Sequence, residues 1–390
     1  MRPATEVERR RLHEVFAELC AIRSVSGEER AMADRVIAEL RSLGLAVQED
    51  GSAALTGLGS GNLLARIPAP RTRADLPPLL LCAHLDTVPH DGVVEPVHED
   101  GGWVSAGDTI LGADNKAAVA VLLVLARRLA LEGSPVGVEL LFTPGEETAL
   151  AGASALEVGS LESAYGYVFD HASPIGEIAL ASPTYYRIQA DFLGAAAHAG
   201  IRPETGRSAV RAAARAIVAM PHGRLDAQTT ANVGHVHGGP PGATNVVPER
   251  ATVLAEVRSL DPQRAEAVVA QVVDVLHDAA NDPDGAVDVD ITVARLFEGY
   301  RQDPDELAVR VAEDALRRCG YEPRHIVTGG GTDANALMAL GGPATVNLAN
   351  GTERNHERTE RVSDDALEGM LDVSLALLLA AADAASVPSS

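Results

Sequence analysis

A run of apolar residues that ends in a histidine and an aspartate constrains this chain more than any other feature. The segment PPLLLCAHLDTVP covers residues 77–89, and its apolar part, 79–83, leads directly into His84 and Asp86. A short apolar run bounded by prolines predicts a strand buried on both faces, as in a parallel sheet. Side chains two positions apart on a strand point to the same side, so His84 and Asp86 would share one face where the strand ends.

The end of such a strand is where ligands bind in open α/β sheets. A histidine with a carboxylate on its own face suits a metal ligand whose ring is oriented by a hydrogen bond. The alternative is a histidine and an aspartate that only cap a strand within a loop. This stretch alone does not decide between the two.

Strands alternate with helices over much of the chain. After the strand that ends at His84, the pattern predicts a helix that begins at Asp114, and strands over 136–143 and 165–169. Alternation of this kind implies βαβ units and a mostly parallel sheet. With 390 residues, the chain is long enough for two domains.

The order of elements changes in the middle of the chain. The expected elements there are a strand at 185–192, a helix at 208–220, strands at 230–237 and 246–258, a helix at 262–280 and a strand at 287–293. This βαββαβ order is typical of ferredoxin-like domains. We therefore predict an α/β fold whose sheet domain, residues 1–182 and 296–390, is interrupted by a ferredoxin-like α+β domain of residues 183–295.

The charge of the chain excludes several classes of partner. With 55 acidic and 32 basic residues the formal net charge is −23, which argues against nucleic acids and anionic membranes. The longest apolar run, 375–382, is too short to span a membrane, and no apolar signal segment stands at the N-terminus. The three cysteines are far apart and typical of reduced thiols, so we expect a cytoplasmic protein.

Histidines and acidic residues follow several predicted strands of the sheet domain. They are His84, Asp86, Asp114, Glu146, Glu147, Asp170 and His356. Loops after strands are rich in solvated acids in any protein, but convergence of so many at one sheet edge argues for a metal site. A divalent cation offsets the repulsion among crowded carboxylates, and imidazole with carboxylate suits zinc, with cobalt or manganese as alternatives.

The adjacent pair Glu146 and Glu147 is the sharpest feature of this set. Neighbouring carboxylates in a non-helical turn point in different directions, so one can bind a cation while the other faces a bound water. A water activated by a cation needs a nearby carboxylate to accept its proton, and this pair can perform both tasks.

Short motifs of the chain stand in a characteristic order. They are HLDTVP (84–89), GADNKAA (112–118), PGEET (144–148), the strand end at Asp170, AAAHAG (195–200), TNVVPE (244–249), EVRSLD (256–261), GGGTDAN (329–335) and NHERTE (355–360). This order resembles that of the dizinc aminopeptidase, carboxypeptidase and aminoacylase superfamily, and most of all its peptidase T-like proteins. The resemblance covers almost the whole chain, and the ordered set is far more specific than any one motif.

The resemblance implies a site with two zinc ions, for which cobalt or manganese are alternatives. The implied ligands are His84, Asp114 and Asp170 for one ion, and the bridging Asp114 with Glu147 and His356 for the other. Glu146 would be the general base for a metal-bridging hydroxide and would later protonate the leaving amine. Asp86 would orient the ring of His84.

The resemblance also implies that the inserted domain is a lid and a dimerisation domain of a homodimer. His198 would reach the active site of the neighbouring subunit and polarise the scissile carbonyl. Asn245 and Arg258 would bind the substrate, and the guanidinium of Arg258 suits a bidentate grip on a carboxylate. Gly330 lies in a tight glycine turn that would present backbone amides to the substrate; a phosphate loop is disfavoured because the Gly-Lys-Ser/Thr sequence is missing.

The function implied is that of an exopeptidase that removes the N-terminal residue from short peptides. The aspartate at position 170 resembles the aminopeptidase branch, since acylase and carboxypeptidase relatives more often have glutamate there. Two departures leave the substrate open: the last motif has HERTE, and His171 directly follows Asp170. The alternatives are an amidohydrolase acting on N-acyl amino acids and a non-catalytic metal-binding homologue.

Overall fold

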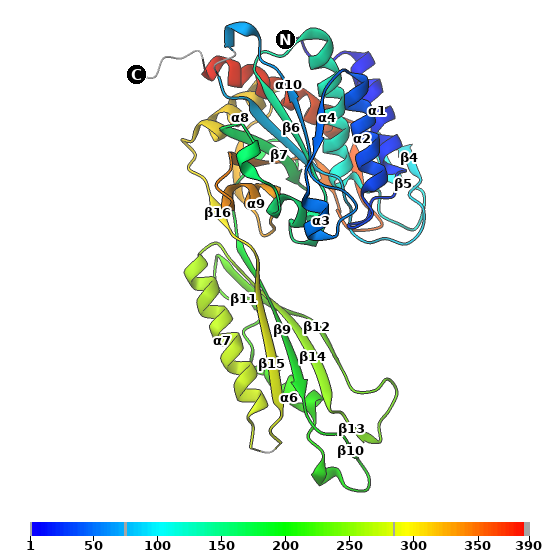
Figure 1. Cartoon of the computed structure of the whole chain (residues 1–390), viewed down its shortest axis with the longest axis vertical. Helices are drawn as coiled ribbons and strands as arrows, with labels where there is room; N and C mark the ends of the chain where they lie inside the picture. The colour runs from blue at the N-terminus through cyan, green and yellow to red at the C-terminus, as the bar shows by residue number, and fades with distance from the viewer. Residues whose placement is uncertain (1, 74–75, 284, 386–390) are drawn as a thin grey trace. The chain divides into compact units, whose positions relative to one another are not determined.

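The computed structural model describes residues 2–73, 76–283 and 285–385. The chain divides into two compact units, one formed by residues 1–181 and 301–390 and the other by residues 182–300. The second unit is therefore an insertion into the first (Figure 1). A mixed, mostly parallel sheet in one unit and a separate antiparallel sheet in the other confirm the predicted fold class.

In the described part of the chain, the first unit is built around a nine-stranded sheet. In spatial order its strands are β1 (Val47–Glu49), β2 (Leu63–Ile67), β6 (Val138–Thr143), β3 (Leu79–His84), β7 (Tyr165–His171), β18 (Ala344–Ala349), β8 (Glu177–Ser182) and β16 (Tyr300–Arg301), with β17 (Arg324–Val327) beside β8. The central strands β6, β3, β7 and β18 run parallel, so their carboxyl ends meet at one edge. Toward the outside of the sheet, β1 pairs antiparallel with β2, β2 with β6, and β8 with β18, whereas β17 runs parallel to β8.

Helices share one apolar core with this sheet. They are α1 (Glu6–Cys20), α2 (Arg30–Ser42), α4 (Ala113–Glu132), α8 (Leu307–Arg318) and α10 (Asp364–Ala384). All six side chains of β3 are buried, as the apolar run predicted. Leu79, Leu81 and Ala83 join the shared core, whereas Sγ of Cys82 lies 4.0 Å from Oδ2 of Asp333, at the start of α9 (Asp333–Ala339).

Helix α4 is buried on nearly all sides because it packs against β3, α1 and α10. Its N-cap Gly112 has φ +74°, a left-handed conformation that residues with a side chain rarely adopt. The backbone then departs from helical angles at Asp114 and Asn115. This irregular start turns Asp114 toward the carboxyl end of β3, where its Oδ1 lies 3.4 Å from Nε2 of His84.

The remaining short elements of the first unit lie in its loops. They are α3 (Ser52–Thr56), α5 (Ala151–Ser154), the 3₁₀ turns η1 (Arg71–Arg73), η2 (Glu146–Thr148) and η3 (Val158–Ser160), and the strands β4 (Pro96–Glu99), β5 (Gly102–Ser105), β19 (Thr352–Glu353) and β20 (Arg361–Ser363). The last four form a small antiparallel sheet in the order β19-β20-β5-β4. This small sheet holds the segment that contains His356, because residues 354–360 connect β19 to β20.

The second unit is an antiparallel sheet with two helices in its apolar core. The strands, in spatial order, are β11 (Gly223–Arg224), β12 (Thr229–Gly238), β14 (Arg250–Ser259), β9 (Thr184–Leu193) and β15 (Asp288–Phe297); the helices are α6 (Ala209–Ala219) and α7 (Pro262–Ala280). Alternate residues of β14, from Ala251 to Val257, are buried in that core, as expected for a sheet with one covered face. The chain order of the long elements is the βαββαβ order that the sequence predicts.

One predicted strand of this unit is wrong in its extent. Residues 246–258 were expected to be continuous, but β13 (Val246–Val247) pairs with β10 (Ala197–His198), and β14 begins only at Arg250. Pro248 separates them, because proline has no N–H to donate to a ladder. Its carbonyl accepts instead from the backbone N–H of Ala209, near the turn η4 (Pro203–Thr205) that precedes α6.

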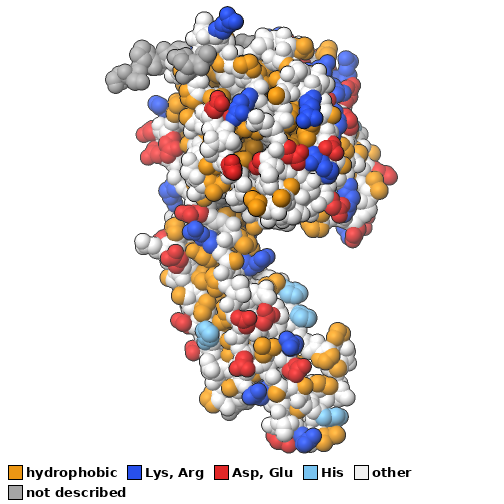
Figure 2. All heavy atoms as spheres, in the orientation of Figure 1, with side chains coloured by type: hydrophobic (Ala, Val, Ile, Leu, Met, Phe, Trp, Pro, Cys, Tyr) orange, Lys and Arg blue, Asp and Glu red, His pale blue; other side chains and the backbone are white. Residues whose placement is uncertain are grey.

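Two surface observations bear on possible partners. Among the described helices, none combines the length and the apolar character that a membrane crossing requires. On the face shown in Figure 2, basic side chains are interspersed with acidic ones and do not gather into a patch.

Candidate metal centre

Three side chains converge at the carboxyl ends of two neighbouring parallel strands. His84 ends β3, Asp170 lies near the end of β7, and Asp114 stands at the irregular start of α4. Nε2 of His84 lies 3.4 Å from Oδ1 of Asp114 and 3.6 Å from Oδ1 of Asp170. These atoms form a group that could hold one metal ion.

A second group shares Asp114 with the first. Nε2 of His356 lies 3.3 Å from Oδ2 of Asp114 and 2.9 Å from Oε1 of Glu147. The two oxygens of Asp114 therefore approach different histidines, as a carboxylate between two cations would. His84 is only 1% exposed and His356 is 50% exposed, so the second group is the one that faces solvent.

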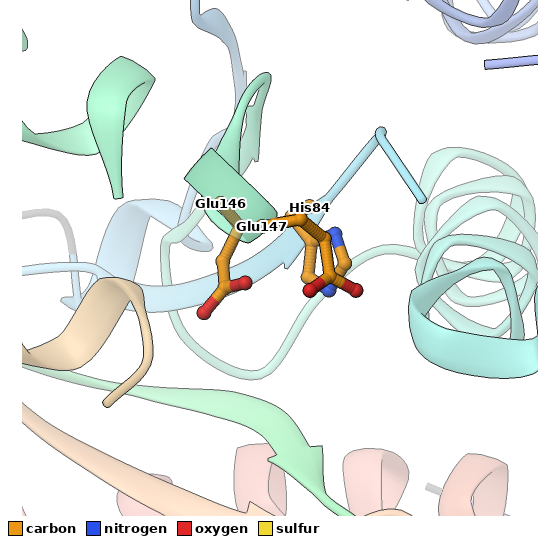
Figure 3. A group of neighbouring side chains, drawn as sticks. All are labelled: His84, Glu146 and Glu147. Atoms are coloured by element: carbon orange, nitrogen blue, oxygen red, sulfur yellow. The ribbon is translucent and has the colours of Figure 1, made fainter. Parts of the chain in front are cut away.

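The turn after β6 supplies the acidic pair. Gly145, with φ +65°, leads into η2, and a third group brings Glu146 and Glu147 together with His84. Figure 3 shows that the two carboxylates point in different directions from adjacent positions. Glu147 therefore belongs to two groups, this one and the one with Asp114 and His356, whereas Glu146 belongs only to the group with His84 and Glu147.

Asp86 holds this turn with its carboxylate. Its Oδ1 accepts from the backbone N–H of Glu146 at 2.9 Å, and its Oδ2 accepts from that of Glu147 at 3.2 Å and from the hydroxyl of Ser26 at 2.6 Å. Nδ1 of His84 lies 3.0 Å from the backbone carbonyl of Asp86 and 3.3 Å from its Oδ1. Asp86 thus contacts His84 through both its main-chain carbonyl and its carboxylate, and the same carboxylate accepts hydrogen bonds from the backbone of the two glutamates.

The charges of the site suit a divalent cation. Burial, together with the nearby charge of Asp114, raises the pKa of Asp170 well above its usual value. Burial and the charge of Asp170 do the same to the pKa of Glu146. Contacts with Asp114 and Glu147 raise the pKa of His356 to about 10. These raised pKa values mean that the site favours bound protons, because added positive charge offsets the repulsion among its carboxylates. A divalent cation would have the same effect.

An orphaned buried oxygen fits the same explanation. Oε1 of Glu147 is buried and accepts no hydrogen bond, although Nε2 of His356 lies only 2.9 Å away. Buried carboxylate oxygens are normally satisfied by donors. Two such atoms that are close but misaligned for a hydrogen bond are arranged like ligands aimed at a shared point. The donor set of imidazoles and carboxylates is one that zinc accepts.

Sequence reasoning missed three polar residues around this centre. Glu360 is buried and accepts from backbone N–H groups near Asp114, and Nδ2 of Asn355 donates to Oδ2 of Asp114 at 2.8 Å. Asp333 is also buried and accepts from the hydroxyl of Thr143, the last residue of β6. The motifs around them were noted, but no periodicity marks a charged loop residue as buried.

The predicted substrate residues of the inserted domain fall in two places. His198 and Asn245 are exposed and lie close together because β10 pairs with β13; the backbone N–H of Ala199 donates to the carbonyl of Asn245 at 2.9 Å. Arg258 lies in β14 with its guanidinium 3.9 Å from the centre of the Tyr185 ring and its Nη2 3.3 Å from Oε2 of Glu256. In the sheet unit, the N–H of Gly330 donates to the hydroxyl of Thr328 at 3.1 Å.

Comparisons with known proteins agree with this description. Residues 184–283 match the family described as Peptidase dimerisation domain, and residues 62–169 match Peptidase family M28. The chain is 36% identical to an uncharacterized protein, YqjE, from Bacillus subtilis, over 96% of this chain and all of that protein.

Two solved structures are similar over nearly the whole chain. Aminopeptidase PepT from Bacillus cereus is 35% identical with a TM-score of 0.84, over 97% of this chain and 99% of the other. A tripeptidase from Staphylococcus aureus is 33% identical with a TM-score of 0.89, over 96% of this chain and 99% of the other. Because the matches cover 96–97% of this chain, the shared fold includes both units.

Proposed function

This chain belongs to the M20 family of metallopeptidases, among its peptidase T-like members, and from that premise we propose that it removes the N-terminal residue from short peptides. The named relatives that support this reaction are an aminopeptidase and a tripeptidase. Tripeptides with a free amine are therefore the substrate class that we propose.

One observation carries the proposal: two groups of side chains that could hold a metal ion share Asp114, and Glu146 lies outside both of them, in a third group with His84 and Glu147. The proposed ligands are His84, Asp114 and Asp170 for one cation, and Asp114, Glu147 and His356 for the other. Two divalent cations at such a site supply Lewis acidity for the scissile carbonyl and acidify water. We propose zinc, with cobalt or manganese as alternatives.

The protein's own part in the reaction is proton transfer and positioning. A carboxylate oxygen of Glu146 accepts the proton of the attacking water and then passes it to the nitrogen of the leaving amine. Asp86 holds Glu146 in place through the backbone N–H groups of the turn. Burial raises the pKa of Glu146 well above its usual value, which makes its carboxylate a stronger proton acceptor.

A substrate comparison tests the choice of reaction. We expect a tripeptide with a free N-terminal amine to be cleaved about 10- to 100-fold faster, in kcat/KM, than its N-acetylated form. The reason is that acetylation removes a cationic amine that hydrogen-bonds in a site rich in carboxylates, and such a bond contributes roughly 1.5–3 kcal/mol. Release of the N-terminal amino acid is the measurement. Preference for the acetylated peptide would identify an N-acyl amidohydrolase instead.

The inserted domain supplies the proposed substrate contacts and the dimer interface. Its match to a peptidase dimerisation family supports a homodimer. In that assembly, we propose that His198 acts on the scissile carbonyl in the neighbouring subunit, that Asn245 contacts the substrate, and that Arg258 binds its carboxylate. Gly330, whose N–H is engaged within its own turn, would contact the substrate as part of the loop rather than as a free amide donor.

The role of Arg258 gives a second prediction. Arg258→Lys should raise KM for a tripeptide by about 10- to 100-fold and change kcat less, because an ammonium group cannot grip a carboxylate through two parallel hydrogen bonds. Steady-state kinetics with the tripeptide and with its C-terminal amide provide the measurement. The amide should be insensitive to the substitution, since it has no carboxylate to lose.

The matched control is Arg264→Lys. Arg264 is an exposed arginine of the same domain, paired with Asp226 at 3.1 Å. It should leave KM unchanged for both substrates. An equal rise in KM for the acid and the amide in Arg258→Lys would show that Arg258 does not bind the carboxylate.

A further inference from the structure

We propose that Asn355 and Glu360 are positioning residues that clamp Asp114 in the geometry needed to hold both cations. The inference rests on the proposed function, because it concerns the affinity of the same site for metal. Both residues lie in the segment 354–360, which also contains His356. We define the clamp as the contacts that Asn355 and Glu360 make with residues 111–114. It therefore joins the segment that contains His356 to the segment that contains Asp114.

Glu360 is the stronger half of the clamp. It is 1% exposed, and its Oε2 accepts from the backbone N–H groups of Leu111 at 2.9 Å and Gly112 at 2.7 Å. Its Oε1 accepts from the N–H of Asp114 itself at 2.9 Å. Three hydrogen bonds from one turn to a single buried carboxyl group are directional, so they fix the backbone from which the Asp114 side chain projects.

The turn needs an acceptor from elsewhere in the fold. The N-cap of α4 is Gly112, which has no side chain to cap the first N–H groups of the helix. Buried N–H groups at a helix start are normally satisfied by a capping side chain or by water. Here Glu360, 246 residues from Asp114 in the sequence, takes that place. Gly112 allows the left-handed turn, and Glu360 holds it there.

Asn355 is the half of the clamp that acts on the ligand side chain. Its Nδ2 donates to Oδ2 of Asp114 at 2.8 Å, the same oxygen that lies 3.3 Å from Nε2 of His356. The hydrogen bond that Asn355 donates restricts rotation about the side-chain bonds of Asp114, and so fixes the orientation of its carboxylate. Outer residues of this kind orient metal ligands, and their loss typically weakens metal binding by about 10- to 100-fold.

The same contacts also hold His356. His356 has φ +68° and Arg354, two residues before it, has φ +56°, left-handed conformations that are unfavourable for residues with a side chain. Asn355 and Glu360 anchor the segment on either side of His356. The hydrogen bonds of Asn355 and Glu360 with residues 111–114 therefore help to stabilise this unfavourable backbone conformation around His356.

The experiment compares cation binding by apo-proteins. We would titrate the wild type, Glu360→Gln and Asn355→Leu with Co²⁺ by calorimetry, and record the visible spectrum of the cobalt forms. Glutamine at 360 turns an NH₂ group toward backbone N–H donors on one side, whichever way its amide is oriented. Leucine at 355 keeps the volume and removes the donor to Asp114. The matched control is Glu357→Gln, the same change at an exposed residue whose carboxylate accepts from Thr359 at 3.2 Å.

We expect both variants to bind Co²⁺ about 10- to 100-fold more weakly than the wild type and to give altered cobalt spectra. Their kcat should return toward the wild-type value at saturating cation, and Glu357→Gln should behave like the wild type. Circular dichroism of each apo-protein establishes that it is folded. A purely structural role would lower thermal stability without changing the affinity of the folded protein for Co²⁺.

Wild-type affinity in Asn355→Leu, or in a folded Glu360→Gln, overturns the clamp. If Glu360→Gln does not fold, Asn355→Leu decides the question alone. Failure of the wild type to bind either Co²⁺ or Zn²⁺ would refute the proposed function, and this result is distinct from a failure of the clamp, in which only the variants lose affinity.

Discussion

Replacing Glu146 by glutamine should leave the cation content of the protein unchanged and lower kcat for a tripeptide by about 10²- to 10⁴-fold. The amide has nearly the same shape as the carboxyl group but cannot accept a proton from water. Glu146 is not a member of either group that shares Asp114, so both groups keep all their side chains. Metal analysis after dialysis and steady-state kinetics are the two measurements.

The control for this variant is Glu157→Gln, an exposed glutamate of the same loop region. It should retain full activity. Two outcomes would count against the assignment of the base. Wild-type turnover in Glu146→Gln would place the proton acceptor elsewhere, and loss of cation from that variant would make Glu146 a ligand rather than a base.

Replacing Asp114 by alanine should remove both cations and all measurable activity. Asp114 is the residue that the two groups share, and its oxygens approach His84 on one side and His356 on the other. The wild type should hold about two cations per chain after dialysis. A cation that binds only the folded state stabilises it by about 4 kcal/mol when its free concentration is 1,000 times Kd. The variant should lose this gain, as thermal unfolding with and without Zn²⁺ would measure.

His356→Ala provides the matched comparison. It removes a ligand from the second group alone, so His84, Asp114 and Asp170 remain together. We expect this variant to keep about one cation per chain and part of the zinc-dependent stabilisation. If Asp114→Ala and His356→Ala lost the same number of cations, Asp114 would not bridge the two groups.

Several features of the fold follow from local patterns. The apolar run 79–83 could only be satisfied by burial on both faces, and β3 is buried at every position. The change from strand–helix alternation to the βαββαβ order predicted an inserted α+β unit, and the order of the long elements agrees with it. The break at Pro248 was missed, although a proline within an apparent strand is itself the signal that β13 and β14 are separate.

The contacts within the candidate site were harder to predict. Asp86 was expected to orient His84, and the structure shows that its carboxylate also holds the turn of Glu146 and Glu147. Which oxygen meets which donor depends on the placement of strands β3 and β6 side by side. A motif specifies the types of residue that are present, but it does not specify the partner of each atom.

The sequence by itself therefore determined the class of fold and the candidate ligands, because burial patterns and strand ends are local properties. The family resemblance implied that the two groups share Asp114, but only the tertiary structure showed that Asn355 and Glu360 form hydrogen bonds with the side chain and the backbone of Asp114. The physical reason is the separation along the chain. Hydrogen bonds between residues some 240 positions apart depend on how the whole sheet and its helices pack, and no local periodicity encodes them.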